Sequence, residues 1–94
     1  MERLTRVMGN NDLYNVDDLT VNHDVNGYTG EAINKLAKFE NIYEDLIASQ
    51  SEISKQLGKL RNEEKTKTVR FRELMFKKMT NVTIIELFKS YGLE

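Results

Sequence analysis

The chain has 94 residues, of which 39% are hydrophobic and 31% are charged, and its net charge is −1. A chain of this length forms one small domain, because it buries only about 60% of the surface that its unfolded form exposes. It contains no cysteine, which excludes a disulfide scaffold, a cysteine-ligated metal site and a cysteine nucleophile. No apolar run approaches the roughly 20 residues of a membrane-spanning helix, and no signal-peptide pattern follows Met1. We therefore expect a soluble, cytoplasmic protein that does not bind membranes.

Residues 1–28 form an N-terminal segment that can contain a β-hairpin. The sequence Gly9-Asn10-Asn11-Asp12 is typical of a turn and separates the stretch from Leu4 to Met8 from the stretch from Leu13 to Val16. A two-stranded ribbon is marginally stable unless something packs on it, so this segment is expected to be small. Three apolar residues alternate with polar ones and allow another short strand: Leu19, Val21 and Val25.

Residues 29–94 are predicted to form a helical hairpin that serves as a coiled-coil oligomerisation region. Apolar residues recur at alternating spacings of three and four from Thr29 to Glu64, which predicts a long coiled-coil-like helix. At about 1.5 Å per residue this seam is some 40 Å long, which exceeds the width of a compact globule formed by a single copy of the chain. We therefore expect a homo-oligomer, with a dimer as first choice. The predicted oligomer seam consists of Leu36, Phe39, Tyr43, Leu46, Gln50, Ile53, Leu57 and Leu60, preceded by Ala32.

The second helix of the hairpin is predicted to follow a short turn near Lys65 to Lys67, within the polar stretch that begins at Arg61. Thr68 carries a side-chain oxygen suited to capping this helix, and Gly92 is a natural stop. Thr80-Asn81 competes for backbone hydrogen bonds, so the segment is either one kinked helix or two short ones. The predicted fold class is mainly α, a long helix and a returning C-terminal helix with a short N-terminal segment.

Gln50 is the one polar residue of the predicted seam. A buried polar residue at such a position commonly fixes the register or the number of helices. Alternatively, the helix is exposed there or the amide reaches Ser49 or Ser54. Both interpretations stay open at this point.

Residues able to carry chemistry are few. His23 is the only histidine, and its neighbours Asn22 and Asp24 favour a loop position. The segment 22–27 resembles the start of a calcium-binding loop, but Ile33 stands where the bidentate glutamate belongs, so a turn at Asn26-Gly27 explains the pattern better. We predict no catalytic residue, no metal and no cofactor.

Charge is unevenly distributed along the chain. Residues 1–54 carry 4 basic and 10 acidic residues, whereas residues 55–78 carry 9 basic and 3 acidic ones. A basic cluster of this kind is able to contact the phosphates of a nucleic acid. It also fits a solvated helix end, or a positive tip that meets the acidic half of another subunit. The cluster comprises Lys55, Lys59, Arg61, Lys65, Lys67, Arg70, Arg72, Lys77 and Lys78.

Several stretches resemble small helical proteins encoded by phages and prophages of low-GC Gram-positive bacteria. They are the opening Met1-Glu2-Arg3-Leu4-Thr5, the run from Ala32 to Glu40, the sequence Tyr43-Glu44-Asp45-Leu46, the run from Lys65 to Met75 and the run from Leu87 to Glu94. Small phage accessory proteins often bind and block a host factor, as anti-CRISPR and other anti-defence inhibitors do. The resemblance thus implies a phage origin and carries over no catalytic residue.

The leading functional hypothesis is a non-enzymatic interaction protein that binds a host protein in the bacterial cytoplasm and inhibits or redirects it. The alternative is a nucleic-acid-binding or regulatory protein that uses the basic cluster of residues 55–78. A structural or assembly component of the phage is the third possibility, and it predicts a higher oligomer.

Overall fold

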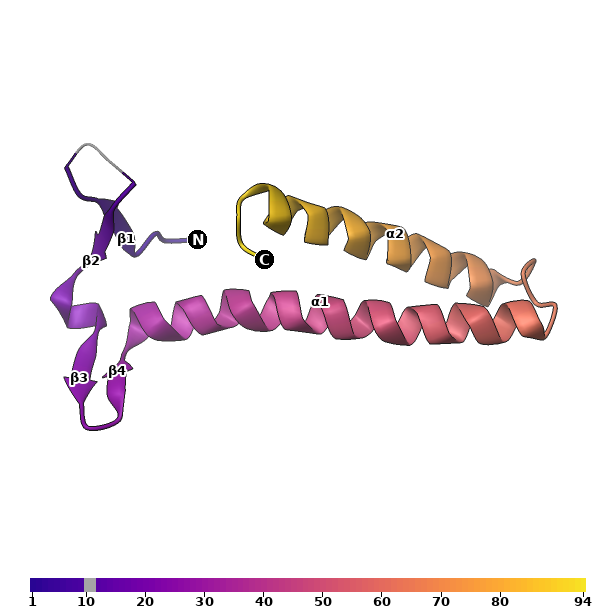
Figure 1. The fold of residues 1–94 in the computed structure, drawn as a ribbon, viewed down its shortest axis with the longest axis horizontal. Helices are drawn as coiled ribbons and strands as arrows, with labels where there is room; N and C mark the ends of the chain where they lie inside the picture. Colours follow the sequence, from indigo (N-terminus) through magenta and orange to yellow (C-terminus); the bar gives the residue numbers. More distant parts are fainter. Residues whose placement is uncertain (10–11) are drawn as a thin grey trace. The chain divides into compact units, whose positions relative to one another are not determined.

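The computed structural model describes residues 1–9 and 12–94, so that Asn10 and Asn11 of the predicted first turn lie outside the described residues. The chain divides into two compact units, Met1–Glu40 and Asn41–Glu94. Two helices contain most of the residues, which confirms the mainly α fold (Figure 1).

The first unit begins with an antiparallel β-hairpin, as the sequence predicts. Strands β1 (Thr5–Val7) and β2 (Tyr14–Val16) pair so that Thr5 lies opposite Val16. The amide of Met8 donates a hydrogen bond of 2.8 Å to the carbonyl of Leu13 and extends the ribbon towards its turn.

A second ribbon follows a single turn of 3-10 helix, η1 (Asp18–Thr20). Strands β3 (Asn22–Asp24) and β4 (Gly27–Thr29) pair in antiparallel fashion across the turn Val25-Asn26, where the Asp24 carboxylate accepts a hydrogen bond of 2.7 Å from the amide of Asn26. The predicted turn is thus present one residue earlier than expected, because Asn26 lies in it whereas Gly27 is the first residue of β4. The sequence allowed one further strand but did not predict a second hairpin.

Gly30 makes the transition from β4 to the long helix α1 (Glu31–Asn62). Its φ is +129°, and a Cβ atom at this position would stand 2.3 Å from the carbonyl oxygen of Thr20. Only glycine therefore fits here. Thr29 belongs to β4, so the helix predicted over Thr29 to Glu64 begins two residues later, at Glu31.

The second unit is a helical hairpin, in which the later turns of α1 run antiparallel to α2 (Val69–Ser90) (Figure 1). After Asn62 the chain reverses at Glu64, whose φ is +58°, and the amide of Lys65 returns to the carbonyl of Leu60 at 2.8 Å. The hydroxyl of Thr68 accepts a hydrogen bond of 3.2 Å from the amide of Phe71. The predicted turn and the predicted cap are both confirmed.

α2 is one uninterrupted helix, which settles the open question at Thr80-Asn81. The hydroxyl groups of Thr80 and Thr83 donate to carbonyls one turn earlier, those of Phe76 and Met79, and so leave the helical hydrogen bonds intact. The amide of Gly92, whose φ is +75°, bonds to the carbonyl of Lys89 at the end of the helix.

The core of the molecule lies between the two helices of the hairpin. Ile53 and Leu57 of α1 form a buried cluster with Leu74 of α2, and Ile85 is buried further along α2. Partly buried side chains complete the cluster: Leu60, Phe71 and Met75.

Candidate interaction surfaces

The predicted oligomer seam is divided between two environments. Ile53 and Leu57 are buried against α2, and the rings of Tyr43 and Phe88 lie 5.6 Å apart between centroids. The seam from Tyr43 onwards is thus covered by the chain's own second helix. Because this covering helix comes from the same chain, it supplies no test of the predicted oligomer, which stays a prediction.

The hairpin interface contains a polar layer. The side-chain amide of Gln50 donates a hydrogen bond of 3.2 Å to the carbonyl of Lys78, while its Oε1 atom is buried and accepts none among the described residues. Asn81 is only 6% exposed and donates a hydrogen bond of 3.3 Å to the hydroxyl of Ser49. Gln50 therefore contacts α2 rather than Ser49 or Ser54, and this contact favours a role in helix register.

An apolar groove lies in the first unit, between the N-terminal segment and the first turns of α1. Its volume is about 630 Å³, which falls in the range of small-ligand and peptide clefts. Leu36 and Phe39, the first residues of the predicted seam, form part of its wall and are 55% and 41% exposed. The remaining apolar walls come from Met1, Leu4, Val16, Val21, Ala32 and Ile33.

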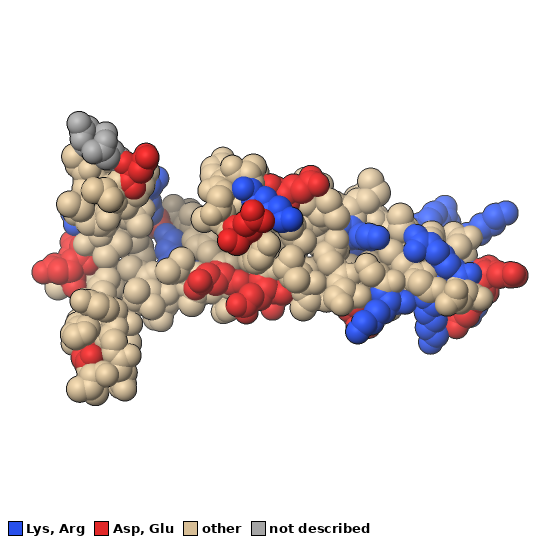
Figure 2. Space-filling view, in the orientation of Figure 1, with Lys and Arg blue, Asp and Glu red and all other residues tan. Residues whose placement is uncertain are grey.

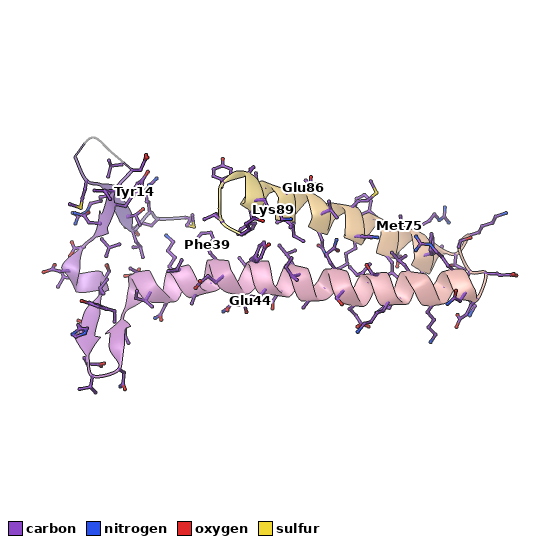
Figure 3. All side chains as sticks on the ribbon, viewed as in Figure 1. Tyr14, Phe39, Glu44, Met75, Glu86 and Lys89 are labelled. Atoms are coloured by element: carbon purple, nitrogen blue, oxygen red, sulfur yellow. The ribbon has the colours of Figure 1, made fainter. Side chains whose placement is uncertain are left out.

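Two cations stand at this groove. The Nε atom of Arg3 donates to the hydroxyl and carbonyl oxygens of Thr5, both at 3.1 Å, and its guanidinium lies 5.5 Å from the centroid of the Tyr14 ring. The Lys35 ammonium donates to the carbonyl of Glu2. Tyr14 and Phe39 are both visible in Figure 3. The lining of the groove is therefore mostly apolar and includes two positively charged side chains.

The face of α2 that points away from α1 is a third surface. Leu74, Asn81 and Ile85 mark the buried side of the helix, and at 100° per residue the opposite side carries Val69 and Phe76. Phe76 is 74% exposed. The exposed large apolar side chains of α2 are Val69, Phe76, Met79, Val82 and Leu87, of which Val82 is the least exposed.

The basic cluster gathers at the turn end of the hairpin, where Figure 2 shows Lys and Arg side chains from both helices and the connecting turn. Lys65 and Glu63, 3.3 Å apart, form the one ion pair found among the described residues. Arg61 lies over the ring of Phe71 at 5.5 Å, and Arg70 donates a hydrogen bond of 2.8 Å to the side chain of Gln56. The predicted contact residues lie in the last turns of α1, in the connecting turn and in the first turn of α2: Lys55, Lys59, Arg61, Lys65, Lys67, Arg70 and Arg72.

His23 lies in strand β3 rather than in a loop, contrary to expectation. Its ring is 4.5 Å from that of Tyr28, its cross-strand partner, between centroids. Across residues 1–9 and 12–94, no group of three or more His, Cys, Asp or Glu side chains is placed to hold a metal ion. Within the same residues, no helix has the length and hydropathy needed to cross a membrane.

Asp17 is the N-cap of η1, and its carboxylate accepts a hydrogen bond of 3.0 Å from the amide of Leu19. This hydrogen bond lowers the pKa of Asp17 from its ordinary value of 3.8, with a smaller contribution from a hydrogen bond with Asp18 and a weak attraction to Arg6. The shift reflects local capping of a turn and marks no catalytic group.

Sequence reasoning missed the groove and the outer face of α2. The groove depends on how the two ribbons meet the helix, which no local pattern encodes. The outer face does have a signal in the sequence, because the apolar residues of α2 form two stripes and one partner helix covers only one of them.

Comparisons of the chain with known protein families, with curated proteins and with solved structures gave no match.

Proposed function

We propose that the chain is a non-enzymatic interaction protein that binds a host protein in the bacterial cytoplasm and inhibits or redirects it, and that it acts as a homo-oligomer, with a dimer as first choice. The apolar groove of the first unit is the observation that carries this proposal. Large apolar side chains that stay exposed in a groove are typical of sites that a partner covers.

The occupant that best fits this groove is a segment of the partner with apolar side chains next to carboxylates. Apolar walls favour burial of an amphipathic helix or strand, and Arg3 and Lys35 at the groove favour acidic residues on that segment. The resemblance to small phage proteins supports a phage origin and an anti-defence target. It is an expectation from the sequence alone.

Capture of host proteins by paired variants tests this function. Leu36→Asp and Phe39→Asp place a charge in the groove wall, and Val25→Asp places the same charge on a fully exposed turn residue outside the groove. We expect one host protein to be retained by the unmodified chain and by Val25→Asp and to be lost with both groove variants. Circular dichroism establishes that each variant keeps its helices. Equal capture by all four proteins would contradict the role of the groove.

The alternative function is nucleic-acid binding by the basic cluster, favoured by the gathering of seven cations at one end of the hairpin with a single ion pair among the described residues. Titration of DNA and RNA by mobility shift at about 50 mM and 200 mM salt tests it, because phosphate contacts weaken steeply with salt. Binding that falls steeply supports this alternative, and absence of binding at the lower salt concentration rejects it.

An assembly component of the phage is a third proposal. It requires an oligomer larger than a dimer. Light scattering on the purified chain distinguishes it from the other two, because a monomer or dimer at all concentrations rejects it.

A further inference from the structure

We propose that two copies of the chain associate through the outer face of α2 as an antiparallel, two-fold dimer. This inference rests on the homo-oligomer of the proposed function and adds the face and the direction of association. It transfers the interface from the predicted seam on α1 to a surface on α2.

The outer face of α2 is free because α1 occupies the opposite face. The core cluster takes Leu74 from one side of α2, whereas Phe76 on the other side is 74% exposed and Met79 is 65% exposed. A helix with apolar residues on two opposite faces is typical of one that is covered on both. One copy of α1 covers only one of them, so a second surface is needed for the other.

The sequence of this face is complementary to itself when it is reversed. Arg72, Met79 and Glu86 are seven residues apart and lie along one edge of the face. A two-fold axis next to Met79 places Arg72 of one copy beside Glu86 of the other, and places Val69 near Leu87 of the other copy. Figure 3 shows Glu86 on α2. In residues 1–9 and 12–94 neither Arg72 nor Glu86 makes an ion pair within its own chain.

The charges on the outer face of α2 favour an antiparallel direction of the two helices and a second copy of the chain as the partner. A parallel pair would place Arg72 next to Arg72 and Glu86 next to Glu86, so that like charges repel. The antiparallel pair instead forms two ion pairs, each between Arg72 of one copy and Glu86 of the other. The match requires the same helix in reverse, which a second copy provides and an unrelated partner provides only by chance. Contact along one helix face buries an area at the lower end of the about 1,200–2,000 Å² of stable interfaces, so we expect a dissociation constant in the micromolar range.

Single cysteines test the direction, because the chain contains none of its own. Val69→Cys and Leu87→Cys are oxidised separately and as a mixture. The antiparallel dimer predicts no cross-link in either separate sample, since two copies of residue 69 stand about 30 Å apart, and a cross-linked heterodimer in the mixture. Self-cross-linking of each separate variant would show a parallel pair and overturn the direction, and absence of cross-links in all samples would overturn the interface.

Sedimentation of charge and apolar variants tests the contacts. Phe76→Asp is expected to weaken the dimer at least about thirtyfold while circular dichroism is retained, because Phe76 takes no part in the hairpin core. Arg72→Glu alone and Glu86→Arg alone are expected to weaken it about tenfold, and the double variant to restore it. Lys77→Glu is the matched control, since it makes the same charge change off the outer face and should leave the dimer unaffected.

The outcomes separate this inference from the proposed function. A chain that stays monomeric at about 100 µM overturns the dimer, yet its capture of a host protein through the groove is unaffected because the groove lies in the first unit. A dimer that captures no host protein leaves the interface on α2 in place and overturns the proposed function. A dimer that Phe76→Asp does not weaken overturns the assignment of this face.

Discussion

Each of the two units of the chain is stabilised internally by a different kind of interaction. The hairpin of residues 41–94 has a core of buried aliphatic side chains, of which Leu57 is completely inaccessible. Among the described residues of the first unit, none is fully buried. The first unit instead contains hydrogen bonds between residues that are near one another in the sequence. Asp17 and Asp24, for example, accept hydrogen bonds from amides two residues further along the chain.

This difference indicates which unit supplies most of the stability and which leaves its apolar side chains exposed. Burial of apolar surface is the dominant favourable term in folding, so the hairpin provides most of the stability of the chain. Two-stranded ribbons with half-buried side chains are marginal by themselves. The first unit is therefore the one that the proposed partner would stabilise more, by covering its apolar groove.

The largest expected effect comes from emptying the core of the hairpin. Leu57→Ala removes most of a side chain that is 0% exposed and is expected to lower the free energy of unfolding by about 2–5 kcal/mol. Ile47→Ala, on an exposed position of the same helix, is the control and should change it by less than about 0.5 kcal/mol. Urea denaturation followed by circular dichroism measures both. Equal losses for the two variants would contradict the dominance of this core.

A change at Gly30 is expected to disrupt the first unit and leave the hairpin folded. A methyl group on Gly30 meets the carbonyl of Thr20 at 2.3 Å and also demands a φ of +129°, which costs an alanine about 1–3 kcal/mol or more. Amide signals of residues in β3 and β4 should shift or broaden in Gly30→Ala, while those of α2 stay in place. Gly58→Ala is the control within α1, where an added Cβ meets nothing and helix propensity predicts a gain of about 0.5–1 kcal/mol.

Replacing Gln50 sharpens the view that the hairpin rests on apolar packing. Its buried Oε1 atom accepts no hydrogen bond among the described residues, so Gln50→Met removes an unsatisfied acceptor at similar volume. We expect the free energy of unfolding, measured by thermal or urea denaturation, to stay unchanged or to rise by about 1 kcal/mol. Asn81→Ala should instead destabilise it by about 1–3 kcal/mol, because this amide is buried and paired with Ser49. A clear loss with Gln50→Met would show that the polar contact to Lys78 outweighs the unsatisfied oxygen.

The smallest effect concerns acid. Because folding lowers the pKa of Asp17, its contribution to the first unit is present above the ordinary value of 3.8 and is lost as the pH falls through the lower value of the folded state. Carboxyl chemical shifts should give a titration midpoint below 3.8 for Asp17, and the cap of η1 should weaken over the same interval. In Asp17→Ala this pH dependence should be absent. A midpoint at or above 3.8 would contradict the capping role.

Sequence patterns predicted the hairpin well because its signals are local. The three-and-four spacing of apolar residues, the cap at Thr68 and the stop at Gly92 each act within a few residues of their position in the chain. The same spacing does not reveal whether the helix that covers a seam comes from the same chain or from another copy, so the division of the seam at Tyr43 could not be foreseen. The close approach of Gly30 to Thr20 depends on the path of the second ribbon, and a glycine by itself does not announce it.

The polar layer between the helices limits the motions open to the hairpin. Two helices with a uniformly aliphatic interface are able to slip past each other by one turn, about 5.4 Å, and exchange one leucine contact for another. In this hairpin such a slip would move the side-chain amide of Asn81 from Ser49 to the level of Leu46 or Ile53. The amide would then be buried without a hydrogen-bond partner. The hairpin is thus expected to open by splaying apart from the end opposite its turn, with the helices keeping their alignment as they separate.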